Sequence, residues 1–177
     1  MPVRRPPIPP TAITRRSTLE LSSPLTHADS DYLNSELNEV LVDRFRTGIF
    51  DEGDLDLADE ILSRDFTAHI PGFPAEWLKG PEGIKQMATA MRDAFPDVGF
   101  SYGVIFARGG KVVLQWTMTG THRGEIFGVA PTGKFVSFTG TDIFLVSPTG
   151  PGGRIAEMWT SWDQWGLLQQ LDALPPS

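Results

Sequence analysis

Residues 120–141 have the sequence GTHRGEIFGVAPTGKFVSFTGT, in which five glycines and one proline interrupt two runs of strand-forming residues. Glycine supplies positive φ and close backbone approach, and proline fixes φ while giving up a hydrogen-bond donor. The backbone that connects the two strands is therefore constrained residue by residue. Such a loop between two long strands predicts the rim of a pocket in a curved sheet.

The size and composition of the chain predict one globular domain. Its 177 residues are 40% hydrophobic and 21% charged, as in ordinary globular proteins. It has no cysteine, which excludes disulfides, zinc–thiolate sites and thiol nucleophiles. Because it has only three histidines, we expect no transition-metal site. No apolar run approaches the roughly 20 residues that cross a bilayer, so we expect no membrane partner.

Charge is spread unevenly along the chain. Residues 1–28 are rich in proline and carry four arginines against one glutamate, which predicts a disordered tail before a domain spanning residues 29–174. The Arg15-Arg16 pair is similar to a twin-arginine export signal, but the apolar stretch that must follow is missing, so we expect a cytoplasmic protein. The chain as a whole has a net charge of −7, and the remainder, with 11 basic and 21 acidic residues, carries −10, which disfavours binding to nucleic acid.

Hydrophobic periodicity predicts helices first and strands afterwards. We expect helices over about residues 30–48, 54–62 and 80–95. The first should end near Gly48. Its apolar residues at helical spacing are Leu33, Leu37, Val40, Leu41 and Phe45.

The pattern then changes to a period of two, which predicts strands over residues 98–107, 111–119, 134–147 and 154–162, before a last helix at 163–172. On the first strand, one face should carry Val98, Phe100, Tyr102, Val104 and Phe106. This order predicts an α+β fold: a cone-shaped, strongly curved antiparallel or mixed sheet with helices packed on its concave side. Such a sheet encloses a cavity that suits small molecules.

Several motifs resemble the SnoaL-like polyketide cyclases, of the nuclear transport factor 2-like superfamily. The resemblance covers about residues 30–173. It is carried by Ala94-Phe95-Pro96-Asp97, Gly110 to Trp116, Gly120-Thr121-His122 with Gly124, Phe127-Gly128, Pro131-Thr132-Gly133, Ser137-Phe138-Thr139-Gly140 and Ile155 to Leu171.

The resemblance implies a cofactor-free, metal-free enzyme that closes a ring in a polyketide by intramolecular aldol condensation. It also implies a catalytic aspartate seven residues after the glycine that begins the last strand, and a histidine on the preceding strand. Thr160 and Phe144 occupy these positions here. Threonine is no general base at neutral pH and phenylalanine has no polar atom, so the family's catalytic pair is absent.

Two other residues could replace that pair. Asp142 shares a strand face with Phe144, and aspartate is unusual in mid-strand, so it is a candidate acid or base or else a structurally paired acid. His69, predicted in a short strand near the cavity mouth, could act as a base or bind a carbonyl; otherwise it is a half-exposed ring.

Other residues are candidates for substrate contact. Thr160, Met158 and Trp162 alternate onto one face of the last strand, with Phe144 facing them from the preceding strand. His122 either touches substrate or binds its own loop. Asp163 is predicted to cap the last helix.

The opposite face of the last strand predicts a partner subunit. Trp159 alternates outward with Glu157 and Ser161, and aromatic residues are frequent at interfaces. We therefore expect a homodimer, which is also what the resemblance implies.

Three functions compete. The first is acid/base chemistry on a polyketide or a related hydrophobic carbonyl compound, with Asp142 and His69 in the catalytic roles. The second is a non-catalytic protein of the same fold that binds a ligand or a partner, having lost the family's aspartate and histidine. The third is a hydrolase, dehydratase or isomerase on the same scaffold, because a fold does not fix a function.

Overall fold

The structure is a computed structural model that describes residues 27–147 and 153–174. Its elements are α1 (His27–Arg44), the π-helix η2 (Phe45–Glu52), α2 (Leu57–Ile61), β1 (Leu62–His69), the 3₁₀ turn η3 (Ala75–Leu78), α3 (Gly80–Ala94), β2 (Gly99–Arg108), β3 (Lys111–Thr121), β4 (Phe135–Ser147), β5 (Arg154–Trp162) and α4 (Gln164–Gln170). The predicted tail lies outside the described residues, apart from the start of α1.

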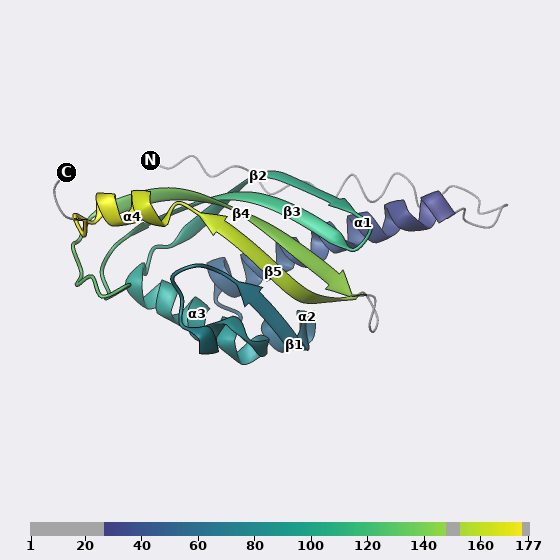
Figure 1. The fold of residues 1–177 in the computed structure, drawn as a ribbon, viewed down its shortest axis with the longest axis horizontal. Coiled ribbons are helices and arrows are strands. Elements are labelled where there is room, and N and C mark those ends of the chain that lie inside the picture. The colour runs from purple at the N-terminus through teal and green to yellow at the C-terminus, as the bar shows by residue number, and fades with distance from the viewer. Residues whose placement is uncertain (1–26, 148–152, 175–177) are drawn as a thin grey trace.

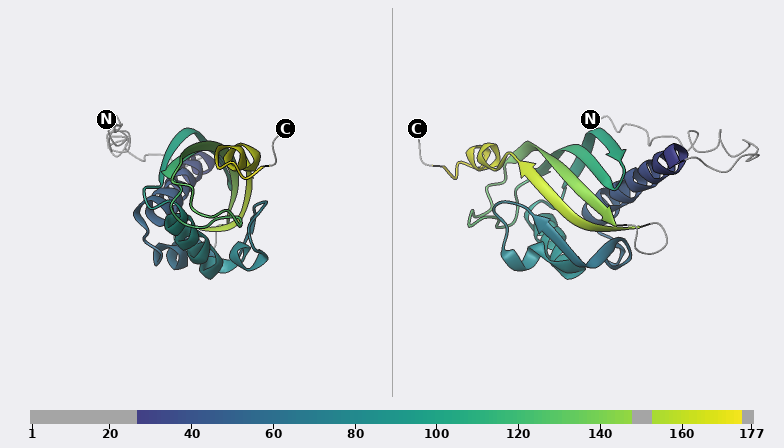
Figure 2. Two further views of the ribbon diagram at one scale, coloured as in Figure 1. Left: turned by 90° about the vertical axis from the view of Figure 1, so that its left-hand side faces the viewer. Right: turned by 45° about the vertical axis from the view of Figure 1, so that its right-hand side comes forward.

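The five strands form one mixed sheet in the order β1-β5-β4-β3-β2 (Figure 1). β1 runs parallel to β5, and the other neighbours are antiparallel. The sheet curves around α1 and α3 (Figure 2), but β1 and β2 remain as edges, so it is not closed into a barrel. The predicted α+β architecture is confirmed.

The sequence predicted that the first helix ends near Gly48, but the helical chain continues past this residue. The chain continues as a π-helix to Glu52, and Gly53, at a φ of 79°, ends it in the left-handed region. A Cβ at Gly48 would overlap the side chain of Leu57. Gly48 therefore permits a close approach of two helices rather than a helix end.

The buried stripe of this helix also differs from the prediction. Leu37 and Val40 are exposed, and the side chain of Leu33 lies outside the described part of α1. From Ser35 onward the first buried position is Asn38, whose side-chain amide donates to the carbonyl of Gly109 at 2.9 Å. This bond ties α1 to the turn between β2 and β3. The buried positions recur at helical spacing through Leu41, Val42, Phe45, Arg46 and Ile49.

The alternation predicted for β2 is wrong in its second half. Phe100 and Tyr102 pack against the core as expected, but the pairing with β3 shifts between Tyr102 and Ile105. A β-bulge adds a residue to one strand and exchanges the faces beyond it. Ile105 therefore packs inward, while Val104 and Phe106 are about half exposed.

The core consists of two hydrophobic clusters. One gathers α1, η2, α2, β1 and the first part of α3 over the adjoining strands. The other gathers the end of α3, α4 and residues 126–129. Within the described residues, no helix is long and apolar enough to span a membrane.

Candidate functional site

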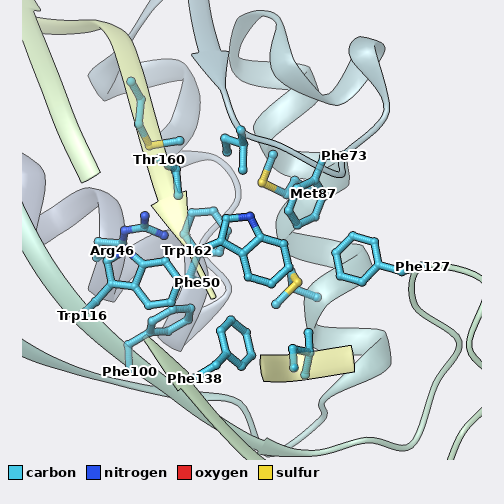
Figure 3. Close-up of a pocket in the computed structure, with 14 residues that line it drawn as sticks. Arg46, Phe50, Phe73, Met87, Phe100, Trp116, Phe127, Phe138, Thr160 and Trp162 are labelled. Carbon is cyan, nitrogen blue, oxygen red and sulfur yellow. The ribbon is translucent and has the colours of Figure 1, made fainter. Parts of the chain in front are cut away.

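A cavity lies where the two core clusters meet. It encloses about 530 Å³ of space free of atoms, including its opening to solvent. Its walls are almost entirely apolar and include Phe50, Phe73, Phe100, Trp116, Phe138 and Trp162. Arg46 adds a guanidinium and Thr160 a hydroxyl to this lining. Figure 3 shows these two near one end, Phe73 and Phe127 at the other, and Trp162 between them.

Arg46 carries a guanidinium into this apolar site. It comes from η2, continues the buried helical stripe and is 5% exposed. Its centre lies 5.2–5.7 Å from four aromatic ring centroids, those of Phe45, Phe50, Phe100 and Trp116. Burial lowers the pKa of Arg46 to about 10, so the group stays cationic at neutral pH.

Asp142 lies directly behind the polar end of the cavity. One carboxylate oxygen accepts from Arg46, and the other accepts from the Thr160 hydroxyl at 2.7 Å. Asp142 on β4 and Thr160 on β5 are register partners. Because both oxygens are engaged and the side chain is fully buried, Asp142 does not line the cavity. It meets the cavity only through Arg46 and Thr160.

The predicted ligand-contact residues divide into two groups. Thr160, Met158 and Trp162 line the cavity. Phe144 does not; it is fully buried, and its ring meets that of Phe45 edge-on at 5.5 Å. Phe144 shares the inward face of the sheet but lies in the core.

His69 lies outside the cavity lining. At the end of β1, its ring stacks on Trp159 at 5.2 Å, and its Nε2 lies 3.1 Å from Oε1 of Glu157. Trp159 and Glu157 are on the neighbouring strand β5, which draws the imidazole toward the outer face. The structure therefore does not bring His69 together with Asp142.

His122 holds its own loop. Its Nδ1 accepts from the backbone N–H of Thr132 at 3.2 Å, and the ring is fully buried outside the cavity lining. Burial lowers its pKa, which favours the neutral ring. The predicted cap is also confirmed, because the side chain of Asp163 accepts from the N–H of Gly166 at 2.8 Å.

A second acidic group lies near Arg46. Tyr102 donates to Oδ2 of Asp51 at 3.4 Å, while Oδ1 of Asp51 is buried and has no hydrogen-bond partner among the described residues. Burial raises the pKa of Asp51 to about 6, although hydrogen bonds from Phe100 and Tyr102 and the charge of Arg46 oppose this. Neither Asp51 nor Tyr102 lines the cavity.

Sequence reasoning missed Arg46. Its signal was present, since a lone arginine interrupts the apolar positions Phe45, Ile49 and Phe50. Within the described residues, no group of three or more His, Asp or Glu side chains is placed to hold a metal ion.

Comparison with known proteins defines the family. The model of the SnoaL-like polyketide cyclase family matches residues 40–171. The chain belongs to this family. A search of curated proteins finds no significant match.

Solved structures agree with this assignment. A candidate polyketide cyclase from Acidithiobacillus ferrooxidans is 30% identical, covers 77% of this chain and 94% of its own, and superposes with a TM-score of 0.66. IdmH from Streptomyces antibioticus, also a candidate polyketide cyclase, is 28% identical over 76% of this chain and 98% of its own, with a TM-score of 0.64. AclR from Streptomyces galilaeus, a candidate hydroxylase, shares the fold at 24% identity over 80% of this chain and 89% of its own, with a TM-score of 0.66.

Proposed function

We propose that this protein binds a polyketide or related carbonyl compound in the aromatic cavity and catalyses cofactor-free acid/base chemistry of the aldol, ring-closing type. The observation that carries the proposal is the cluster of Arg46, Thr160 and Asp142 at one end of an otherwise apolar cavity. Family membership and the polyketide cyclase descriptions of its relatives support the same chemistry.

The position of Asp142 supports a role for its carboxylate. In the pattern that the family implies, the catalytic aspartate occupies the position of Thr160. Here the carboxylate lies on the register partner of that position, one strand away. A carboxylate is thus present beside the position of the family's catalytic aspartate, but on the neighbouring strand, with Thr160 between it and the cavity.

The proposed reaction uses Thr160 to pass a proton to Asp142. A proton leaves the carbon next to a substrate carbonyl for Oγ1 of Thr160 while the threonine's own proton moves to Oδ1 of Asp142. The resulting enolate carbon then bonds to a second carbonyl carbon of the same molecule. The alkoxide formed takes the proton back through Thr160, so the reaction is an isomerisation that needs no co-reactant.

Exchange of carbon-bound protons tests this function without knowledge of the natural substrate. We expect the protein to accelerate deuterium uptake at the α-carbons of 2-tetralone in D2O, followed by NMR. Thr160→Val should reduce the rate to that of buffer, whereas Thr160→Ser should retain most of it. Thr139→Val, on the exposed face of β4, is the matched control. Equal rates in wild type and Thr160→Val would contradict the proposal.

One observation favours a second candidate, a non-catalytic ligand-binding protein. Among the residues that the structure describes, no carboxylate or imidazole belongs to the cavity lining, so a base can act on the ligand only through the Thr160 hydroxyl. Tight binding of a flat carbonyl compound, with no exchange above the buffer rate, would establish this candidate.

We also propose a homodimer that forms through the outer face of the sheet. The outward positions of β4 carry no charged side chain between Phe135 and Leu145, and Phe135, Ile143 and the neighbouring Trp159 are 67%, 41% and 39% exposed. An uncharged face with exposed aromatic residues suits a protein interface. Sedimentation should show a dimer that Trp159→Arg dissociates; a wild-type monomer would exclude it. The cytoplasmic location stays a prediction, to be tested by cell fractionation.

A further inference from the structure

We infer that Arg46 and the indole N–H of Trp116 form an oxyanion-binding site, which takes the enolate or phenolate oxygen of a flat ring compound. The inference rests on the proposed function, because it assigns the group that meets the charged oxygen in the cavity. It concerns ligand binding, however, and can be tested without turnover.

The inference rests on two hydrogen-bond donors of cavity-lining residues that have no partner. Among the described residues, four buried side-chain polar atoms have no hydrogen-bond partner, and two of them are Nε of Arg46 and Nε1 of Trp116. Both residues line the cavity, and the centre of the guanidinium lies 5.5 Å from the Trp116 ring. A buried donor without a partner is costly, and an oxygen of the ligand would relieve that cost at both atoms.

The aromatic surroundings make Arg46 suited to this task. The four rings around the guanidinium hold it in place and exclude water from its faces. In such a site a fixed donor interacts with a developing negative charge more strongly than it does in water. Asp142 anchors one edge of the same guanidinium, which prevents it from swinging away when a ligand enters.

Thr160 determines which group of the ligand lies at each side of the polar end of the cavity. A carboxylate beside Arg46 is only an acceptor, so the Thr160 hydroxyl must donate its proton to Asp142. It therefore presents only lone pairs to the cavity. An anionic oxygen is repelled by these lone pairs and attracted to the Arg46 and Trp116 donors, whereas an acidic C–H or O–H group fits against Thr160.

The opposite end of the cavity accommodates the rings of the ligand. Phe127 stacks on Trp162 with centroids 5.7 Å apart and meets Phe73 edge-on at 5.2 Å. Flat hydrocarbon surfaces pack well against such rings. The ligand is thereby oriented with its oxygen at Arg46 and its hydrocarbon part between these three side chains.

The ionisation of a bound phenol tests the site directly. We would titrate 2-naphthol by absorbance, free and bound to the wild-type protein. An apolar cavity alone raises the pKa of a phenol, and a cationic donor lowers it by about 1–3. We expect bound 2-naphthol to ionise at least about one pH unit below the free compound. An unchanged or raised value in the wild-type protein would overturn the inference.

A paired variant provides the matched comparison. Arg46→Met alone would leave Asp142 buried without its partner, so it is combined with Asp142→Leu. This double variant should no longer lower the pKa of 2-naphthol, and its binding of 2-methoxynaphthalene, which cannot ionise, shows that the cavity is still formed. A retained lowering would also overturn the inference. Failure of the wild type to bind either naphthalene would instead count against the proposed ligand cavity as a whole.

Discussion

The hydroxyl of Thr160 lies 2.7 Å from Oδ1 of Asp142, its register partner across β4 and β5. The second oxygen of the same carboxylate accepts from Arg46. One fully buried carboxylate thus fixes the guanidinium and the hydroxyl of the cavity lining. The chemistry available to a ligand depends on this carboxylate even though the ligand cannot touch it.

Removing one partner of the buried Arg46–Asp142 ion pair should lower the stability of the protein far more than replacing both partners. Asp142→Asn leaves the Arg46 charge without compensation and should lower the free energy of unfolding by about 3–5 kcal/mol, whereas replacing both residues with apolar ones should cost much less. Urea denaturation measures both. The exposed pair of Arg44 and Glu60 is the control, because Glu60→Gln should change stability by less than about 1 kcal/mol. An equally small effect of Asp142→Asn would disprove the importance of the buried pair.

His122 should make the protein less stable in mild acid. Burial lowers its pKa below 6.5, so the unfolded chain binds the proton more readily than the folded one. The contribution of the neutral His122 ring to the free energy of unfolding is therefore complete above pH 6.5 and is lost as the pH falls below 6.5. For one proton, the free energy of unfolding changes by at most about 1.4 kcal/mol per pH unit. Unfolding free energies between pH 8 and 5 should fall less steeply in His122→Gln. Parallel curves would show that His122 does not titrate on unfolding.

Asp51, in contrast to His122, should make the protein less stable as the pH rises. Burial raises its pKa from 3.8 to about 6, so the folded state holds the proton more tightly and loses stability as the pH rises through this window. Asp51→Asn should stabilise the protein at pH 8 by about 1 kcal/mol, a figure reduced because solvent screens a half-buried group. At pH 4 the gain should disappear. Asp65→Asn, at an exposed position of β1, should show no such difference between the two pH values.

Gly140 should be intolerant of any side chain. A Cβ there would overlap the six-membered ring of Trp116, so Gly140→Ala must displace the indole and should cost about 1–3 kcal/mol. Because Trp116 lines the cavity, affinity for 2-naphthol should fall as well. Gly99→Ala is the matched control, since its Cβ would meet nothing nearer than Oγ1 of Thr119 at 3.9 Å. Similar stabilities of the two variants would contradict this account.

The sequence predicted most of the architecture because its signals are local. The period of two over β3, β4 and β5, the proline near the start of α3 and the cap at Asp163 each depend on neighbouring residues. The errors arose where a distant contact decides the outcome. Gly48 is required by Leu57, and the bulge in β2 reverses the faces of Val104 and Phe106.

The site was predictable only in part for the same reason. Alternation placed Met158, Thr160 and Trp162 on the inward face, and they line the cavity. It also placed Asp142 inward, but alternation cannot tell a cavity wall from the layer behind it. Arg46 comes from a helix 96 positions earlier in the chain than Asp142, a pairing that no local pattern contains.

The polar end of the cavity joins a π-helix near the beginning of the described chain to the last two strands. During synthesis, a ribosome must therefore release residue 160 before these groups can assemble. A molecule that recognises them ignores truncated and incompletely folded chains and binds only the finished protein, which it then stabilises by mass action.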